Sequence, residues 1–194
     1  MGINFTRGEG MLENFLAVQR ARLADSQIAD HLRRGRILDV GCGFRPYFLS
    51  TINFQEKFGL DKNFFKVDNI NLIQQDVEKN NVLPFVDNYF EVVTALAFLE
   101  HLEAEIALKA LKEIYRILKP GGLLIITVPR KEIDLLLKFM AKIKLVSAIE
   151  INEHKQLYSK AMIKRQLIES GFKARDINIK SFEFGLNLFA VGKK

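Results

Sequence analysis

Residues 37–46 read Ile-Leu-Asp-Val-Gly-Cys-Gly-Phe-Arg-Pro, an apolar strand that runs directly into a glycine turn and a helix start. Gly41 and Gly43 have no Cβ, so the backbone there can adopt otherwise strained angles and can approach a ligand closely. In open α/β sheets, ligands bind in the crevice at the carboxyl ends of the strands. The segment therefore predicts a ligand site at the end of the first strand of an α/β sheet.

The rest of the chain alternates short apolar runs with segments of helical periodicity, which is typical of a parallel sheet with helices on both faces. We expect strands at 36–40, 57–60, 71–75, 90–96, 123–128, 176–184 and 187–192, and helices at 11–32, 104–118, 131–149 and 160–170. The apolar side of the first helix is expected to carry Leu12, Phe15, Leu16, Leu23, Ile28 and Leu32. The predicted fold is a doubly wound, seven-stranded, mostly parallel sheet whose last strand is antiparallel. A length of 194 residues fits one domain over 1–194.

Two kinds of nucleotide ligand compete for such a turn. The dinucleotide fingerprint G-x-G-x-x-G needs a third glycine where this chain has Pro46, which argues against a bound pyrophosphate. The acidic residue that holds ribose hydroxyls is expected about 20 residues beyond the turn, and Asp61 stands 20 positions after Gly41. The spacing therefore predicts a ligand that contains a ribose and no diphosphate.

Six motifs in order carry a family resemblance: LDVGCG at 38–43, GLD at 59–61, QQD at 74–76, LPF at 83–85, FEVVTALAFLEHL at 90–102 and LKPGGLLIITVPR at 118–130. In this set the chain resembles the class I S-adenosylmethionine-dependent methyltransferases. It is most similar to the broad small-molecule group (methyltransferase type 11-like) that ends its fourth strand in Glu-His-Leu. The resemblance covers 35–130 as the half that binds the cofactor, preceded by a leading helical segment at 1–34. Residues 131–194 would then carry the substrate side and the terminal strand pair.

The resemblance implies S-adenosylmethionine as cofactor, with S-adenosylhomocysteine as product, and gives roles to matching residues. Asp39, Gly41 and Gly43 would surround the methionine end. Asp61 would accept the ribose hydroxyls, and Asp76 the adenine amino group. The expected cofactor-binding set is completed by Cys42, Lys62, Gln75, Val77, Leu96 and Ala97. We assign no metal ligands.

Two positions depart from the family pattern. Arg45 replaces a further glycine and is followed by Pro46, which the first turn of a helix tolerates. Arg45 could face an anionic substrate or simply solvent. Glu91 replaces the usual aspartate, and we expect little consequence.

A sulfonium methyl group is already reactive, so the protein mainly has to align the acceptor and exclude water. Cys42, the only cysteine, lies inside the cofactor turn and is excluded as a nucleophile by that position. If a general base is needed, His154 is the preferred candidate because it begins a loop on the expected substrate side. His101, after the fourth strand, is the second candidate, although it could equally cap a helix.

Charge is unevenly distributed along the chain, whose net charge is +6. Residues 1–104 hold 11 Lys and Arg against 14 Asp and Glu, and residues 105–194 hold 18 against 9. The basic second half could steer an anionic substrate, or it could be solvated lysines on helix faces. The helix expected at 131–149 is apolar except for one charged stripe. It could pack on the sheet, close over an apolar substrate, form a dimer face or contact a membrane surface.

These features predict an enzyme that methylates a small, anionic or apolar-anionic molecule. A single cysteine and the lack of a secretory signal or transmembrane run favour the cytoplasm. The Asn/Asp-Pro-Pro-Tyr/Phe signature of base methylation is absent after the fourth strand, which disfavours nucleic acid. A cofactor-binding regulatory subunit and an RNA methyltransferase remain alternatives, and the oligomeric state stays open.

Overall fold

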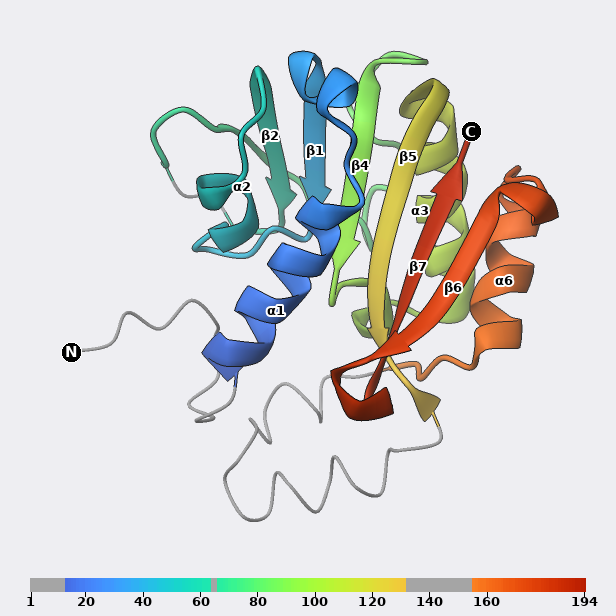
Figure 1. Ribbon diagram of the computed structural model, residues 1–194. Coiled ribbons are helices and arrows are strands. Elements are labelled where there is room, and N and C mark those ends of the chain that lie inside the picture. The colour runs from blue at the N-terminus through green and yellow to red at the C-terminus, as the bar shows by residue number, and fades with distance from the viewer. Residues whose placement is uncertain (1–12, 64–65, 132–154) are drawn as a thin grey trace.

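The computed structural model of the protein describes residues 13–63, 66–131 and 155–194 (Figure 1). The strands are β1 (Arg36–Val40), β2 (Glu56–Asp61), β3 (Asn71–Gln74), β4 (Phe90–Leu96), β5 (Leu118–Pro129), β6 (Ile177–Phe182) and β7 (Asn187–Lys193). The α-helices are α1 (Glu13–Ser26), α2 (Tyr47–Thr51), α3 (Ala104–Ile117) and α6 (Lys160–Glu169). Short 3-10 helices are η1 (Asp30–Arg34), η2 (Leu99–His101), η4 (Ala174–Asp176) and η5 (Glu183–Gly185).

The strands form one sheet in the order β3-β2-β1-β4-β5-β7-β6. Neighbours from β3 to β5 pair in parallel, and β7 pairs antiparallel with both β5 and β6. The predicted doubly wound sheet with an antiparallel last strand is confirmed. The direction of winding reverses between β1 and β4, and this switch point is where open α/β sheets bind ligands.

Helices cover both faces of the sheet, with α1 and α2 on one side and α3 and α6 on the other (Figure 1). Ile37 and Val92 belong to the apolar cluster under α1 and α2, whereas Leu38 and Val93 belong to the cluster under α3 and α6. Successive strand residues point to opposite faces, so adjacent residues enter different layers. Burial on both faces explains why these strands read as continuous apolar runs.

The first helix differs from the prediction. It ends at Ser26 rather than continuing to 32, and η1 follows after a turn. Phe15, expected on the apolar side, is 54% exposed. The buried residues of α1 are Ala21 and Ala24, whose small side chains let the helix pack closely on α2. Of the residues expected on the apolar side, Leu23, Ile28 and Leu32 do contact the core, so the prediction failed at Phe15 and missed the two alanines.

The fifth strand is longer than predicted. It begins at Leu118 and includes Pro120, Gly121 and Gly122, which were expected to separate helix from strand. The register with β4 shifts between Phe90 and Val92 at this point, which is the signature of a bulge. Residues 132–149 of the helix expected at 131–149, and His154, lie outside the described residues. Among the described helices, none combines the length and apolar character needed to cross a membrane.

Candidate functional site

Asp61 and the glycine turn are in direct contact at the carboxyl ends of β1 and β2. The backbone N–H of Gly43 donates to Oδ2 of Asp61 at 3.0 Å. Oδ1 of the same carboxylate accepts from the backbone N–H and the side-chain amide of Asn63, at 2.9 and 3.2 Å. Each oxygen of Asp61 is thus oriented by backbone, and the side chain is 9% exposed. A fixed carboxylate with further lone pairs can accept hydroxyl hydrogens from a ligand.

The two glycines of the turn have different surroundings. Gly41 and Gly43 adopt φ angles of +76° and +70°, in the left-handed region that favours glycine. A Cβ added to Gly41 would lie 2.2 Å from the ring of Phe98, whereas one added to Gly43 would meet no heavy atom within 4 Å in the described structure. The space beside Gly43 is therefore open on the side where a ligand would approach.

Asp39 is buried at the end of β1 and accepts a hydrogen bond from the hydroxyl of Thr94 on β4, at 2.6 Å. Burial raises the pKa of Asp39 to about 7; the Thr94 hydroxyl acts against this rise and the charge of Asp61 adds to it. Two carboxyl groups thus lie close enough to influence each other. A cationic ligand between them would relieve that repulsion.

Cys42 turns its side chain away from the open side of the turn. A Cβ added to Gly59 of β2 would lie 2.8 Å from Sγ of Cys42, and Cys42 belongs to the apolar cluster under α1 and α2. Burial, above all, raises the pKa of the Cys42 thiol, and the carboxylates of Asp39 and Asp61 raise it further. The side chain is therefore a core residue, and only its backbone belongs to the turn.

The remaining predicted residues follow β2 and β3. Asp76 is an accessible acid, and the others have structural contacts or differ in burial. Oδ1 of Asp76 accepts the backbone N–H of Glu78 at 3.1 Å, and its other oxygen lies 3.5 Å from Nζ of Lys79. Gln75 donates its side-chain amide to the carbonyls of Asn80 and Val82. Two further candidates differ in burial: Val77 is buried in the core, and Lys62 is exposed.

The end of β4 supplies the floor between the glycine turn and β5. Leu96 packs partly buried against the core, and Ala97 follows with φ +53°, an unusual angle for a residue with a Cβ. The backbone N–H of Ala97 donates to the carbonyl and the hydroxyl of Thr127 on β5. This bend directs Phe98 over Gly41.

The segment after β4 is joined to the chain that leads into α6. His101 is half-buried on η2, and the carbonyl of the preceding Glu100 accepts the backbone N–H groups of Lys155 and Gln156. Tyr158 is fully buried there, and its hydroxyl contacts the carbonyl of Leu99 at 3.4 Å. His101 therefore lies in a short helix that follows Leu96 and Ala97 in the chain. The structure does not describe His154, so its role as a general base stays a prediction.

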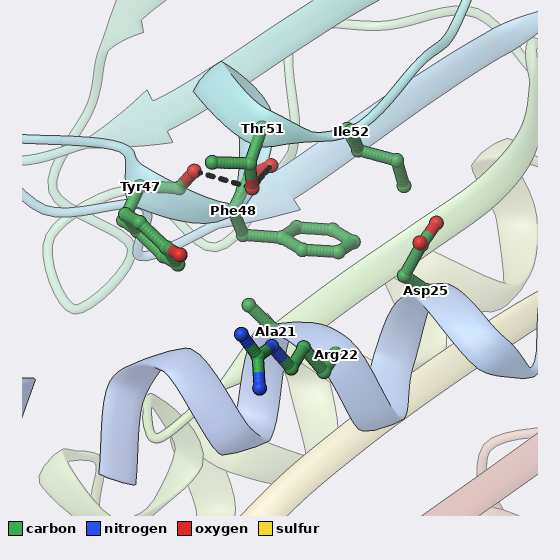
Figure 2. A pocket seen from close by; sticks show the side chains of 7 residues that line it. All are labelled: Ala21, Arg22, Asp25, Tyr47, Phe48, Thr51 and Ile52. Carbon is green, nitrogen blue, oxygen red and sulfur yellow. Dashed lines mark hydrogen bonds between the residues drawn. The ribbon is translucent and has the colours of Figure 1, made fainter. Parts of the chain in front are cut away.

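A hollow lies between α1 and α2, beside the helix that the glycine turn opens (Figure 2). It is lined by Ala21, Arg22, Asp25, Tyr47, Phe48, Thr51 and Ile52. The hydroxyl of Thr51 donates back to the carbonyls of Tyr47 and Phe48 within α2. Because α1 packs directly on this short helix, it constrains the turn that precedes it.

Sequence patterns did not identify Thr94, Asn63 or Phe98 as parts of the site. The one signal in the sequence for Thr94 was that it is a polar residue within an otherwise apolar strand. Phe98 carries no comparable mark, because its contact with Gly41 joins segments distant in sequence. Asn63 contacts Asp61 only two residues away, but it belongs to none of the quoted motifs.

The donor and acceptor set fits S-adenosylmethionine. An oriented carboxylate at Asp61 suits ribose hydroxyls, the acids Asp39 and Asp61 suit a cation, and the open side of Gly43 leaves room for a ligand backbone contact.

A family model described as a methyltransferase domain matches residues 12–177. One curated relative, uncharacterized protein MJ0638 of Methanocaldococcus jannaschii, is 38% identical over 97 residues, which are 50% of this chain and 41% of that protein. The ubiquinone/menaquinone biosynthesis C-methyltransferase UbiE of Pectobacterium atrosepticum is 40% identical over 60 residues, 31% of this chain and 22% of that protein. The matched segments thus span less than half of either relative.

Among solved structures, a SAM-dependent methyltransferase from Archaeoglobus fulgidus superposes with a TM-score of 0.66 at 18% identity, covering 94% of this chain and 100% of that one. This likeness concerns the fold. The match over most of the chain shows that the protein belongs to the methyltransferase domain family. The family and the fold agree with the class I S-adenosylmethionine-dependent methyltransferases that the six motifs resemble.

Proposed function

We propose that this protein transfers a methyl group from S-adenosylmethionine to a small anionic molecule by direct in-line displacement. The observation that supports this most strongly is the hydrogen bond between Gly43 and Asp61. It joins the glycine turn of β1 to the acid of β2, two features that are 18 residues apart in sequence. S-adenosylmethionine carries a ribose next to a charged amino acid, so a site for it needs the glycine turn and the acid at one place.

In this proposal Asp61 binds the ribose hydroxyls and Asp76 the adenine amino group. The turn at Gly41 and Gly43, with Asp39 behind it, holds the methionine end. Lys62 and Val77 flank the adenine, and Leu96 and Ala97 form the floor. The contacts of Gln75 and Cys42 assign them a supporting role, in which Gln75 braces the loop at 80–82 and Cys42 packs beneath the turn.

S-adenosylmethionine supplies, when bound, a methyl group already activated by its sulfonium. The residues of the chain then have to orient the acceptor, exclude water and, for a hydroxyl or amine acceptor, accept a proton. His101, which follows the floor residues Leu96 and Ala97 in the chain, is the described candidate for accepting that proton. His154 stays a candidate from the sequence alone.

The anionic character of the acceptor rests on the basic second half of the chain, which can attract anions. The single, buried cysteine accords with our expectation of a cytoplasmic enzyme. No described contact favours the regulatory-subunit or RNA alternatives over this proposal.

Isothermal titration with S-adenosylmethionine tests the cofactor site. We predict that Asp61→Ala weakens binding by about tenfold to a hundredfold, because hydrogen bonds to a carboxylate contribute about 1.5–3 kcal/mol. Asp68→Ala is the matched control, since Asp68 is an exposed acid in the loop before β3. No heat with the wild type, or equal affinities for the two variants, would contradict the proposed site. Formation of S-adenosylhomocysteine across a panel of small acceptors then tests the transfer reaction.

A further inference from the structure

The turn between β6 and β7 holds a carboxylate that the proposed cofactor site does not use. Glu183 begins η5 in this turn. The turn lies at the end of the sheet toward which β1, β4 and β5 point, the end that also carries the glycine turn (Figure 1). The sequence motifs assigned no site residue to this strand pair, so Glu183 was not among the predicted site residues.

One oxygen of Glu183 lacks a hydrogen-bond partner. Oε1 is buried and accepts no hydrogen bond from any residue in the described part of the chain, while Oε2 accepts from the side-chain amide of Asn187. Buried polar atoms without a partner are rare and costly, and they need an explanation. The backbone of Glu183 has φ +49°, which is also unfavourable for a residue with a Cβ. Strained residues of this kind gather at ligand sites.

Two guanidinium groups lie at this turn, and one of them is close to the carboxylate of Glu183. Arg20 of α1 interacts with it electrostatically: burial raises the pKa of Glu183, and Arg20 and Asn187 act against that rise. Arg130, directly after β5, places its Nη1 3.7 Å from where a Cβ on Gly185 would lie. The turn thus holds one unpartnered acceptor oxygen near Arg20, and Arg130 lies beside Gly185, two residues further along the chain.

We propose that Glu183 is a specificity-determining residue, whose Oε1 accepts a hydrogen bond from a hydroxyl of a methyl acceptor that also carries an anionic group. Arg20 and Arg130 pair with that anionic group. This inference rests on the proposed function and deepens it, because it names the acceptor class as hydroxy acids.

The position in the sheet separates this role from proton abstraction. β7 is three strands from β1 in the sheet order, which corresponds to about 14 Å at about 4.8 Å per strand. Glu183 therefore binds a part of the acceptor remote from the methyl group, and it acts on acceptor affinity rather than on the reacting atoms.

The test is calorimetric binding of two probe pairs to the protein saturated with S-adenosylhomocysteine: salicylate against benzoate, and lactate against propionate. Each pair differs by one hydroxyl beside a carboxylate. In the wild type we expect the hydroxylated member of at least one pair to bind at least about tenfold more tightly, as a hydrogen bond to a carboxylate implies. In Glu183→Gln the difference disappears. The substituted side chain keeps its oxygen toward the amide of Asn187 and so presents N–H₂ where Oε1 stood.

Glu56→Gln is the matched control, because Glu56, on β2 in the other half of the sheet, is a half-buried carboxylate that pairs with Arg36. It should retain the hydroxyl preference. The melting temperature of Glu183→Gln checks its fold. It should equal or exceed that of the wild type, because a buried charge is removed. A wild type without hydroxyl preference for either pair, or a variant that keeps it, overturns the assignment. Failure of S-adenosylhomocysteine to bind the wild type would instead refute the proposed function.

Discussion

At Asp39, burial determines the protonation of the site. Its carboxyl lies between β1 and β4, and Thr94 and Asp61 are its neighbours. Burial raises its pKa from 3.8 to about 7. The folded protein therefore holds this proton more tightly than the unfolded chain does. Linkage then requires the free energy of unfolding to fall as the pH rises from about 4 to about 7, and to level off above that range.

We predict that Asp39→Asn removes most of this fall, which amounts to at most about 4 kcal/mol because each pKa unit corresponds to about 1.36 kcal/mol. Urea unfolding of both proteins at several pH values across that range measures the difference. Asp68→Asn, at an exposed position, should follow the wild-type curve. Parallel curves for Asp39→Asn and the wild type would contradict the prediction.

Single residues were predictable where a motif carried them. Asp61 was expected from its 20-residue spacing to Gly41, and the structure brings it into contact with Gly43. The hydroxyl partner of Asp39 was not expected, because Thr94 is 55 residues away. The unpartnered oxygen of Glu183 depends on packing from three elements and leaves no pattern in sequence.

At the scale of elements, the turn between β1 and α2 combines backbone geometry with space for a ligand. Both glycines have positive φ angles, but only Gly41 faces a side chain, the ring of Phe98. We predict that Gly41→Ala and Gly43→Ala share a backbone cost of about 1–2 kcal/mol. Gly41→Ala should cost more, since the ring has to move.

Urea unfolding measures the two costs, and S-adenosylmethionine titration separates their effects on binding. Gly43→Ala should weaken cofactor binding although its fold is the less affected, because its methyl group projects into the open space beside the turn. Equal stabilities for the two variants, or undisturbed binding by Gly43→Ala, would count against this description of the turn.

Element boundaries were predicted best where local signals ended them. β1 and β4 match the expected ranges 36–40 and 90–96, because apolar runs end there in a glycine turn and in the bend at Ala97. α1 was predicted too long, and Phe15 was wrongly expected to be buried, since Ala21 and Ala24 are the residues of α1 that are buried. Pairing with β4 decided that β5 starts at Leu118.

For the whole molecule, position in the sheet determines local stability. β4 and β5 lie in the middle of the sheet and are mostly buried on both faces, whereas β3 and β6 are the edge strands. We predict that amide hydrogens in β4 and β5 exchange slowest and those in β3 and β6 fastest, because edge strands open with the least loss of burial. Hydrogen exchange followed by mass spectrometry measures this order. Faster exchange in β4 than in β6 would contradict the observed strand order.

The amino-acid sequence by itself determined the class of fold, the cofactor and most of the acids expected to bind it. These depend on local patterns: an apolar strand before a glycine turn, an acid at fixed spacing, and motifs in a fixed order. Only the tertiary structure decided which partners surround those acids, that Cys42 lies in the core, and that Glu183 keeps an unpartnered buried oxygen near the guanidinium group of Arg20. The physical reason is that burial and charge proximity arise from contacts between distant segments, and local sequence does not encode those distances.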